Sequence, residues 1–462
     1  MAEQVTLIGR VVYGARNAFA HLAGALERHG MLGRGVRLVL VEGDPLPVAR
    51  EEASRGRRVA VLYGLSTPVF LELAEEVARV AREYPVVAGG PHAEGAYWQL
   101  LRLGAWAAVV GDGENALPAL VEALLGERSL EDVPNIAFMP EPGGFRVTRI
   151  SHVSLDEYPP YHRGLGLYPP IEIMRGCPYR CRFCQVPWLF KARVRFRGLD
   201  AVLDAVSAYV SAGRRRIRFI APIGFAYLSP EPGRPNPGAI EELLRGVRER
   251  GGTPFLGSFP SETRPEYVTP GVLRAVKRYA GNRRISVGLQ SGSDRVLELS
   301  GRGHSVAEAL EAIDLVFKYG FTPVVDIIFG LPGEEEEDVE KTIAVMEQLA
   351  ARGARLRLHT FLPLPGTPLA QARPKPVHPR YREAVRRLLG RGVIEGDWEP
   401  QERLAREMYC LTALDPAPTR RPSPLPGAEG LCGDVWARFG PLLGLEEPGD
   451  GPPGGLGQRG SG

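Results

Sequence analysis

The chain has few cysteines, no long apolar run and little net charge. Its 462 residues include five cysteines, and its formal net charge is +3 at pH 7. Its start lacks a basic leader joined to an apolar run, and no stretch approaches the ~18 consecutive apolar residues of a membrane span. An odd number of cysteines, three of them clustered, argues against a disulfide framework and for a reducing compartment and a metal. We therefore expect a cytoplasmic location without a membrane span, and interpret Cys410 and Cys432 as isolated buried or loop residues.

A strong excess of basic residues is also missing. Arginine outnumbers lysine, but the total charge is nearly balanced, so the sequence shows no clear nucleic-acid site. The run Arg214, Arg215 and Arg216 is interpreted as a solvated helix end. With 44% hydrophobic and 24% charged residues, the chain has a globular composition, and its length allows two or three cores of ~150 residues each.

The first part of the chain alternates short, nearly continuous apolar runs with helical patterns. Such runs are typical of buried parallel strands, because helices cover both of their faces. The pattern predicts a doubly wound, Rossmann-like α/β domain over residues 1–128, with strands at 5–9, 36–43, 59–64, 85–90 and 107–113. Residues 129–168 lose the alternation and accumulate proline, glycine and tyrosine, which predicts a linker containing one hairpin.

A second α/β series occupies residues 169–370. It predicts a parallel, partial (β/α)6 barrel whose strand C-termini carry the functional residues, with strands at 171–174, 216–222, 253–259, 284–290, 322–330 and 354–361. We expect a helical C-terminal extension over 371–414 and a Pro/Gly-rich, largely disordered tail over 415–462. Within that tail, "DVWARFGPLLGL" is a short segment able to dock as a helix.

Three cysteines are concentrated in "MRGCPYRCRFCQVP" (174–187), directly after a predicted strand. The spacing places Cys177, Cys181 and Cys184 on one tight loop. Three thiolates can hold three irons of a cubane iron–sulfur cluster, so that the fourth iron keeps an open position for a substrate. The alternative is a Cys3His zinc site that uses His152 or His162.

This loop resembles that of the radical SAM superfamily, in which S-adenosylmethionine (SAM) chelates the unique iron of a [4Fe-4S] cluster. Phe183 matches the aromatic residue that commonly precedes the third cysteine. Further segments, "ISVGLQSGSDRVLELSGRGH" (285–304), "VVDIIFGLPGEEEEDVEKT" (324–342) and "HTFLPLPGTPL" (359–369), resemble the fourth, fifth and sixth strands of the same barrel. The resemblance implies that the three cysteines ligate the cluster.

The resemblance also implies contacts to SAM. Gln290 and Ser291, at the end of the fourth strand, are expected beside the SAM ribose and methionine. Gly330 is expected in the turn that follows the fifth strand. Glu334 is expected either in that turn or as the cap of the next helix, where a carboxylate would face the positive end of the helix dipole.

The second barrel strand departs from the family pattern, because "APIGFAYLS" replaces the usual Gly-Gly-Glu turn. Backbone carbonyls near Pro222 and Gly224 are therefore the expected acceptors for the SAM amino group. After the third strand, Ser261 and Glu262 are the polar candidates for the SAM ribose or carboxylate. A buried pair with Arg264 is the competing role for Glu262.

Two glycine-rich turns of the first domain, "VVAGGPHAEG" (86–95) and "AAVVGDGENALPALVEAL" (107–124), resemble those of cobalamin-binding domains that precede many radical SAM barrels. Glycine lets the backbone approach a flat macrocycle closely. The expected contacts are Gly89, Gly90, Pro91, His92, Gly111, Gly113 and Glu114. The segment "FAHLAG" has His21 and Gly24 but lacks the aspartate of the Asp-x-His-x-x-Gly motif. Cobalamin is therefore expected to bind without a histidine ligand from the protein. The alternative is that His21 ligates the cobalt.

Residues 1–410 together resemble the B12-binding-domain radical SAM proteins, most closely a subset of unknown function. The resemblance implies reductive cleavage of SAM to a 5′-deoxyadenosyl radical and, in the methylating branch, methylation of an unactivated carbon with the help of cobalamin. The expected partners are an unknown small-molecule, lipid or peptide substrate and an electron donor such as flavodoxin or ferredoxin.

Three alternatives remain open. The same architecture supports radical rearrangement or carbon–carbon coupling, with or without cobalamin. A methylthiotransferase would share the barrel motifs but needs further N-terminal cysteines, and none precedes Cys177. A non-enzymatic cobalamin sensor or carrier would have a zinc-stabilised second domain.

Overall fold

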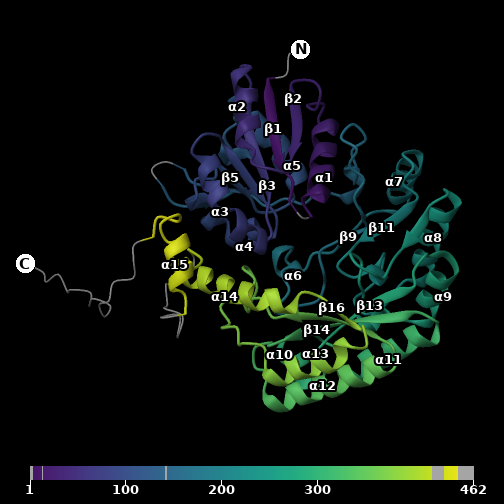
Figure 1. Ribbon diagram of the computed structural model, residues 1–462. Helices are drawn as coiled ribbons and strands as arrows, with labels where there is room; N and C mark the ends of the chain where they lie inside the picture. The colour runs from purple at the N-terminus through teal and green to yellow at the C-terminus, as the bar shows by residue number, and fades with distance from the viewer. Residues whose placement is uncertain (1–3, 13, 141–142, 419–430, 446–462) are drawn as a thin grey trace, which may run out of the picture.

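The computed structural model describes residues 4–12, 14–140, 143–418 and 431–445. Two α/β domains follow one another, and the last described helices return from the second domain to the first (Figure 1). Within these residues, every helix is too short or too polar to cross a bilayer. Much of the tail that the sequence predicts to be disordered lies outside the described residues.

The first domain is built on a seven-stranded sheet in the order β2-β1-β3-β4-β5-β6-β7. Strands β1 to β5 are parallel and largely buried, which confirms the doubly wound domain. The chain order reverses between β1 and β3, where such sheets open a crevice at their strand C-termini. The elements are β1 (Val5–Arg10), α1 (Ala15–Arg28), β2 (Val36–Val41), α2 (Leu46–Ser54), β3 (Arg58–Gly64), α3 (Thr67–Ala81), β4 (Val86–Gly89), α4 (Pro91–Arg102), β5 (Ala107–Val109) and α5 (Gly113–Leu125).

The hairpin expected in the linker belongs to this sheet. β6 (Ile136–Phe138) pairs antiparallel with β5, and β7 (Arg146–Val147) pairs antiparallel with β6. The sheet therefore continues to residue 147, beyond the expected boundary at 128. The short apolar run of β6 is fully buried, and only its pairing with β5 reveals where it belongs.

The second domain is an open barrel made of two parallel sheets. Their orders are β12-β11-β8 and β13-β14-β15-β16, and a bridge between Thr263 and Val287 joins them. Alternate strand residues such as Phe219 and Ile327 belong to the largest core, so their neighbours face the other side of the sheet. This arrangement confirms the partial barrel. The extension that we expected to be helical also contains a strand, β16, which pairs with β15.

The barrel elements alternate along the chain as the sequence indicates. They are β8 (Ile171–Glu172), β9 (Met174–Arg175), α6 (Val186–Leu189), β10 (Arg195–Phe196), α7 (Leu199–Ser211), β11 (Arg216–Ile220), α8 (Pro237–Glu249), β12 (Thr253–Phe255), α9 (Pro270–Tyr279), β13 (Arg284–Gln290), α10 (Asp294–Leu299), α11 (Val306–Lys318), β14 (Thr322–Phe329), α12 (Glu336–Ala351), β15 (Arg355–Thr360), α13 (Pro379–Leu389) and β16 (Ile394–Glu395).

Helix α14 (Trp398–Leu414) bridges the two domains. Trp398 lies in the barrel core, whereas Met408 and Leu411, further along the helix, lie in a core of the first domain. Helix α15 (Gly433–Phe439) also docks on the first domain, where the ring of Phe439 stacks on that of Phe70 at 6.4 Å. The segment "DVWARFGPLLGL" therefore docks as a helix, as its apolar pattern predicts.

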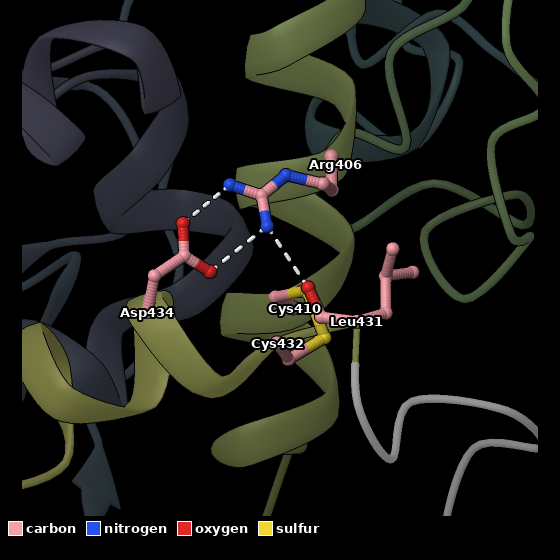
Figure 2. The surroundings of a disulfide bond; sticks show 5 residues. All are labelled: Arg406, Cys410, Leu431, Cys432 and Asp434. Carbon is pink, nitrogen blue, oxygen red and sulfur yellow. Dashed lines mark hydrogen bonds and ion pairs between the residues drawn. A yellow bond between two sulfur atoms is a disulfide. The ribbon is translucent and has the colours of Figure 1, made fainter.

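Cys410 and Cys432 form a disulfide, with 5.3 Å between their Cα atoms (Figure 2). Beside it, the Arg406 guanidinium pairs with Asp434 at 2.8 Å and donates to the Leu431 carbonyl at 2.9 Å. The interpretation of these cysteines as isolated residues is therefore wrong. Packing of α14 and α15 on the first domain joins residues separated by 22 positions, and their spacing does not reveal this contact.

Replacing Cys410 by serine is expected to destabilise the C-terminal segment. A disulfide across 22 positions restricts the unfolded chain by about 3 kcal/mol in the chain-entropy account. Thermal unfolding should therefore begin at a lower temperature in Cys410→Ser, and dithiothreitol should shift the wild type by the same amount but leave the variant unchanged. Equal melting temperatures in all four samples would contradict the bond in solution.

Candidate functional site

The three clustered cysteines lie on a loop that β9 and β10 close. These strands pair antiparallel, so the two ends of the loop 176–194 lie side by side. Directly after β9, Gly176 has a φ of +84°, and a Cβ at this position would lie 1.9 Å from the Arg193 carbonyl oxygen. Only glycine fits here, which explains the glycine directly before the first cysteine of the motif.

The three thiols are free and mostly shielded from solvent. Cys177 and Cys181 are buried and Cys184 is half-buried. Burial raises the pKa of Cys177, and burial together with the nearby Cys181 raises the pKa of Cys184 to about 12. Thiolates at these positions thus need a cation to stabilise them, which the irons of a cluster supply. Phe183 is half-buried against a small apolar cluster beside this loop.

Two buried arginines face the middle cysteine. Nη1 of Arg264 lies 3.4 Å, and Nη1 of Arg302 lies 3.5 Å, from the sulfur of Cys181. Glu266 pairs with Arg264 at 2.7 Å, but within the described ranges no carboxylate forms an ion pair with Arg302, whose Nε has no hydrogen-bond partner. Because a buried cation without a counter-ion is costly, this place suits an anionic group, and a thiolate-ligated cluster fits.

The zinc alternative finds no fourth ligand. His152 lies 3.6 Å from Asp112, and His162 lies 3.7 Å from Glu27. In the part of the chain that the structure describes, no three His, Cys, Asp or Glu side chains converge where one metal ion could bind. A mononuclear site needs convergent ligands, whereas a cluster takes one thiolate on each of three separate irons. The donor set therefore fits the cluster better than zinc.

Several predicted SAM contacts lie at the C-terminal ends of parallel strands. Gln290 ends β13 with a φ of +80°, at an irregularity of its register with β14. A non-glycine residue in this conformation is uncommon and is often found at functional sites. Gly330, with a φ of +72°, follows β14. Gly224 is buried and donates its N–H to the Glu262 carbonyl at 2.7 Å, whereas Pro222 is exposed.

Two predicted SAM contacts use their hydroxyl groups within the protein. Ser291 is fully buried; its Oγ lies 3.3 Å from that of Thr342 in α12 and accepts the Ser293 N–H at 3.2 Å. Ser261 is also buried and donates to the Ser258 carbonyl at 3.1 Å. Ser291 thus connects the turn after β13 to α12, which the motif does not predict.

Glu262 pairs with Arg357 of β15 at 3.0 Å. Its competing role as the partner of Arg264 is therefore wrong, because Glu266 occupies that guanidinium. The Glu262 side chain keeps 28% of its surface exposed, so a contact with SAM stays a prediction.

Glu334 holds the turn after β14 and does not cap α12. The Gly330 N–H donates to its carboxylate at 3.1 Å, and the Tyr381 hydroxyl donates at 2.8 Å. The cap is the next residue, Glu335, which forms a capping box with Asp338. Burial raises the pKa of Glu334 to about 7 despite the two donors.

This carboxyl is expected to make stability depend on pH. Because its folded pKa lies above the unfolded value, Glu334 contributes stability below about pH 4.5 that is lost as the pH rises toward 7. The free energy of unfolding of the wild type should fall by up to about 3 kcal/mol over this pH range, and Glu334→Gln, which has no carboxyl to ionise here, should not show this fall. The melting temperature of the wild type should therefore fall, relative to that of Glu334→Gln, between pH 5 and pH 8. Parallel pH profiles of the two proteins would rule this out.

A cavity of ≈ 390 Å³ lies where the first domain meets the barrel. Gln185, directly after Cys184, belongs to its lining, so the cavity reaches the cysteine loop. It is formed from both domains: its lining includes Gly89, Gly90, Pro91, Gly111, Gly113 and Glu114 of the first domain and Glu172, Arg175 and Gln185 of the barrel. Ligand sites of doubly wound sheets occupy this edge, and six of the seven residues expected to contact cobalamin lie here.

The seventh residue, His92, lies outside the lining. It is fully buried, its ring stacks on Phe70 at 3.8 Å, and Nδ1 lies 3.3 Å from Oγ1 of Thr67. Burial lowers its pKa to about 3. His92 therefore packs in the core behind the Gly89–Pro91 turn and is not available to a ligand in the cavity.

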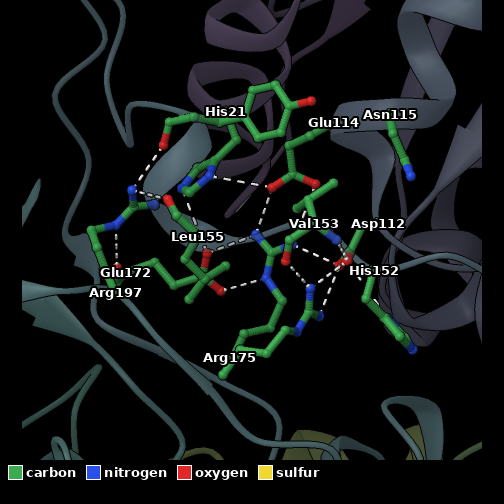
Figure 3. Close-up of polar contacts among 12 residues, drawn as sticks. His21, Asp112, Glu114, Asn115, His152, Val153, Leu155, Glu172, Arg175 and Arg197 are labelled. Atoms are coloured by element: carbon green, nitrogen blue, oxygen red, sulfur yellow. Dashed lines mark hydrogen bonds and ion pairs between the residues drawn. The ribbon is translucent and has the colours of Figure 1, made fainter.

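His21 of α1 belongs to the lining of the cavity, and Figure 3 shows its contacts with Glu114 and Glu172. Its Nδ1 lies 3.5 Å from Glu114 and its Nε2 lies 3.8 Å from Glu172. Both nitrogens of His21 thus face carboxylates of the protein.

Sequence reasoning missed three arginines of this region. Arg175 lies within the quoted cysteine segment, two positions before Cys177, and Arg302 lies in the "SGRGH" part of the quoted barrel segment. Their positions in these segments were the available signal. Arg195 has no local signal, because only the pairing of β9 with β10 brings it to the site.

Two protein families match separate parts of the chain. The Radical SAM superfamily matches residues 171–346, and the B12 binding domain matches residues 14–121. An uncharacterized protein of Methanopyrus kandleri is 27% identical over 339 residues, 62% of each chain. A tRNA-2-methylthio-N(6)-dimethylallyladenosine synthase of Thermus thermophilus is 32% identical over 253 residues, 54% of this chain and 51% of that protein. The chain thus spans about half to three-fifths of the length of these relatives.

Two solved structures share the fold. The radical SAM methyltransferase TsrM from Kitasatospora setae, with cobalamin and a [4Fe-4S] cluster bound, has a TM-score of 0.64 and 19% identity, over 81% of this chain and 80% of its own. The cobalamin-dependent SAM radical enzyme OxsB, with aqua-cobalamin and SAM bound, has a TM-score of 0.61 and 16% identity, over 77% and 53%. The two matched domains imply a [4Fe-4S] cluster, SAM and cobalamin as cofactors. The chain therefore carries a B12 binding domain followed by a domain of the Radical SAM superfamily.

Proposed function

We propose that this protein is a cobalamin-binding radical SAM enzyme that methylates an unactivated carbon of its substrate. The observation that carries the proposal is the shared cavity, in which Gln185 of the cysteine loop lines the same space as the glycine turns of the B12 binding domain. When the cofactors are bound, the reduced cluster supplies the electron that cleaves SAM, and cobalamin supplies the methyl group. The fold shared with the methyltransferase TsrM supports the methylating branch.

The residues of the chain would bind the cofactors, orient them and exclude water. Cys177, Cys181 and Cys184 would hold the cluster, while Arg264 and Arg302 place positive charge beside it. The strand-end glycines would let the backbone approach cobalamin. Apolar side chains from both domains keep water out of the space between the sites, among them Leu22, Leu117, Val186, Leu189 and Phe190.

Anaerobic reconstitution tests this function. The purified chain is loaded with iron, sulfide and cobalamin, reduced with dithionite and mixed with SAM. We expect bound iron and cobalt, a visible band that dithionite bleaches, and release of 5′-deoxyadenosine and S-adenosylhomocysteine. Absence of 5′-deoxyadenosine would exclude a radical SAM enzyme, and 5′-deoxyadenosine without S-adenosylhomocysteine would favour rearrangement or carbon–carbon coupling over methylation.

We also propose an acidic one-electron donor, such as a flavodoxin or ferredoxin, as a partner. The cluster loop exposes Arg180 and Arg182 on either side of the buried Cys181. Their charge would attract an acidic surface close to the cluster. Reduced flavodoxin in place of dithionite should support 5′-deoxyadenosine formation at low salt and lose rate as the ionic strength increases, and a rate independent of salt would argue against this docking surface.

A further inference from the structure

Both ends of the cysteine loop are attached to one carboxylate of the B12 binding domain, that of Asp112; Figure 3 shows Asp112 with Arg175, at the first of these ends. Arg175 ends β9, Arg195 begins β10, and the strand register pairs them. Arg175 donates to Oδ1 of Asp112 at 2.7 Å, and Arg195 donates to the same oxygen at 3.0 Å. Arg195 also donates to Oδ2 of Asp112. Asp112 therefore holds both ends of the segment that carries the three cysteines.

Asp112 is itself held firmly in place. Its side chain is 1% exposed, and it lies in the turn between β5 and α5 that lines the cavity. Its Oδ2 accepts the Val153 N–H at 3.0 Å, and its backbone carbonyl accepts from the Asn135 side chain at 3.0 Å. An aspartate at a helix N-terminus ordinarily caps the helix, but the Asp112 side chain caps no N–H of α5. Its carboxylate instead pairs with the two arginines and accepts the Val153 N–H, and Nδ1 of His152 lies 3.6 Å from it.

Two further carboxylates orient Arg175. Its guanidinium donates at 2.7 Å to Glu114 of the B12 binding domain and at 2.7 Å to Glu172 of the barrel. Burial opposes ionisation of Glu114, yet the charge of Arg175 keeps the pKa of this carboxyl well below its usual range. The ion pair between Arg175 and Glu114 therefore persists at neutral pH, and it crosses the boundary between the domains.

Stability alone does not explain this cluster of charges. Buried ion pairs often contribute little net stability, because desolvation offsets their attraction. Arginine–carboxylate pairs are nevertheless highly directional, since the planar guanidinium donates along fixed directions. Such pairs fix the position of one chain segment relative to another more effectively than apolar packing does.

We propose that Asp112 is a positioning residue that fixes the distance between the cobalamin cavity and the cluster loop. It acts through Arg175 and Arg195, at the two ends of that loop. The inference rests on the proposed function, because it requires both cofactors to bind. Misplacement of reacting groups by 1 Å can reduce a rate by about 10²-fold, so a loose anchor affects transfer between the two sites most.

The test is Asp112→Asn in the full chain, reconstituted with cluster and cobalamin. Asparagine keeps the size of the side chain but loses the charge that both arginines share. We expect iron and cobalt contents near those of the wild type and about tenfold less S-adenosylhomocysteine. In pulsed electron paramagnetic resonance, the distribution of the magnetic coupling between the reduced cluster and cob(II)alamin should be broader than in the wild type. A coupling distribution identical to that of the wild type overturns the inference.

Glu52→Gln is the matched control. Glu52 is a buried carboxylate of the same domain, held by Thr6 at 2.8 Å and by Arg55 at 2.6 Å, but it lies outside the cavity lining. Its replacement should leave the coupling unchanged, and equal broadening in both variants would overturn the positioning role. If Asp112→Asn does not fold, Arg195→Gln takes its place with the same expected broadening and the same disproof.

The two proposals fail in different ways. If the wild type binds no cobalamin or releases no 5′-deoxyadenosine, the proposed function is wrong. If the wild type does both and Asp112→Asn leaves the coupling unaltered, only the role of Asp112 is wrong.

Discussion

Replacing any one of Cys177, Cys181 or Cys184 by alanine is expected to reduce 5′-deoxyadenosine formation to background. Each thiol is the donor for a separate iron in the proposed cluster, and in the described part of the chain no group of three His, Cys, Asp or Glu side chains offers another metal site. The variants should also lose the visible absorption of the cluster and most of the bound iron. Quantification of iron, sulfide and 5′-deoxyadenosine in the same sample measures both effects.

Cys410→Ala is the control for this series. Cys410 belongs to the disulfide that joins α14 to the residue before α15, so its loss should lower the melting temperature without changing iron content or SAM cleavage. A fully active Cys181→Ala variant, or a Cys410→Ala variant that loses its cluster, would contradict the assignment of these cysteines.

Replacing Gly176 by alanine is expected to disrupt the cluster loop although no ligand is removed. The new Cβ would lie 1.9 Å from the Arg193 carbonyl oxygen, a contact that forces β9 and β10 apart. Since the loop is anchored through these strands, the three cysteines would move relative to one another. We expect iron content and SAM cleavage to fall at least tenfold, together with a destabilisation of a few kcal/mol.

Gly213→Ala separates this contact from backbone strain. Gly213 also has a positive φ, of +75°, but nothing lies within 4 Å of a Cβ at that position. Both variants carry the cost of alanine in a left-handed conformation, about 1–2 kcal/mol, and only Gly176→Ala carries the collision. If the two variants retain the same amount of iron, the collision does not control the loop.

The sequence predicts much of the fold, because its signals are local. Continuous apolar runs alternating with helices indicate β1 to β5 and the barrel strands, and the three-cysteine spacing indicates the cluster loop without any knowledge of contacts. The pattern predicts less well where the same residue type has two uses. The acidic run after β14 suits a helix cap, but the cap is Glu335, while Glu334 turns back to Gly330 and Tyr381.

The sequence by itself determined the two α/β domains, the cysteine loop and the glycine turns, because periodicity and spacing within short segments specify them. Only the tertiary structure decided that Cys410 pairs with Cys432, that His92 lies behind the cavity wall, and that Asp112 holds both ends of the cysteine loop. The physical reason is the same in each case. These contacts join side chains from segments far apart in the chain, and packing between the domains, rather than any local pattern, sets which of them meet.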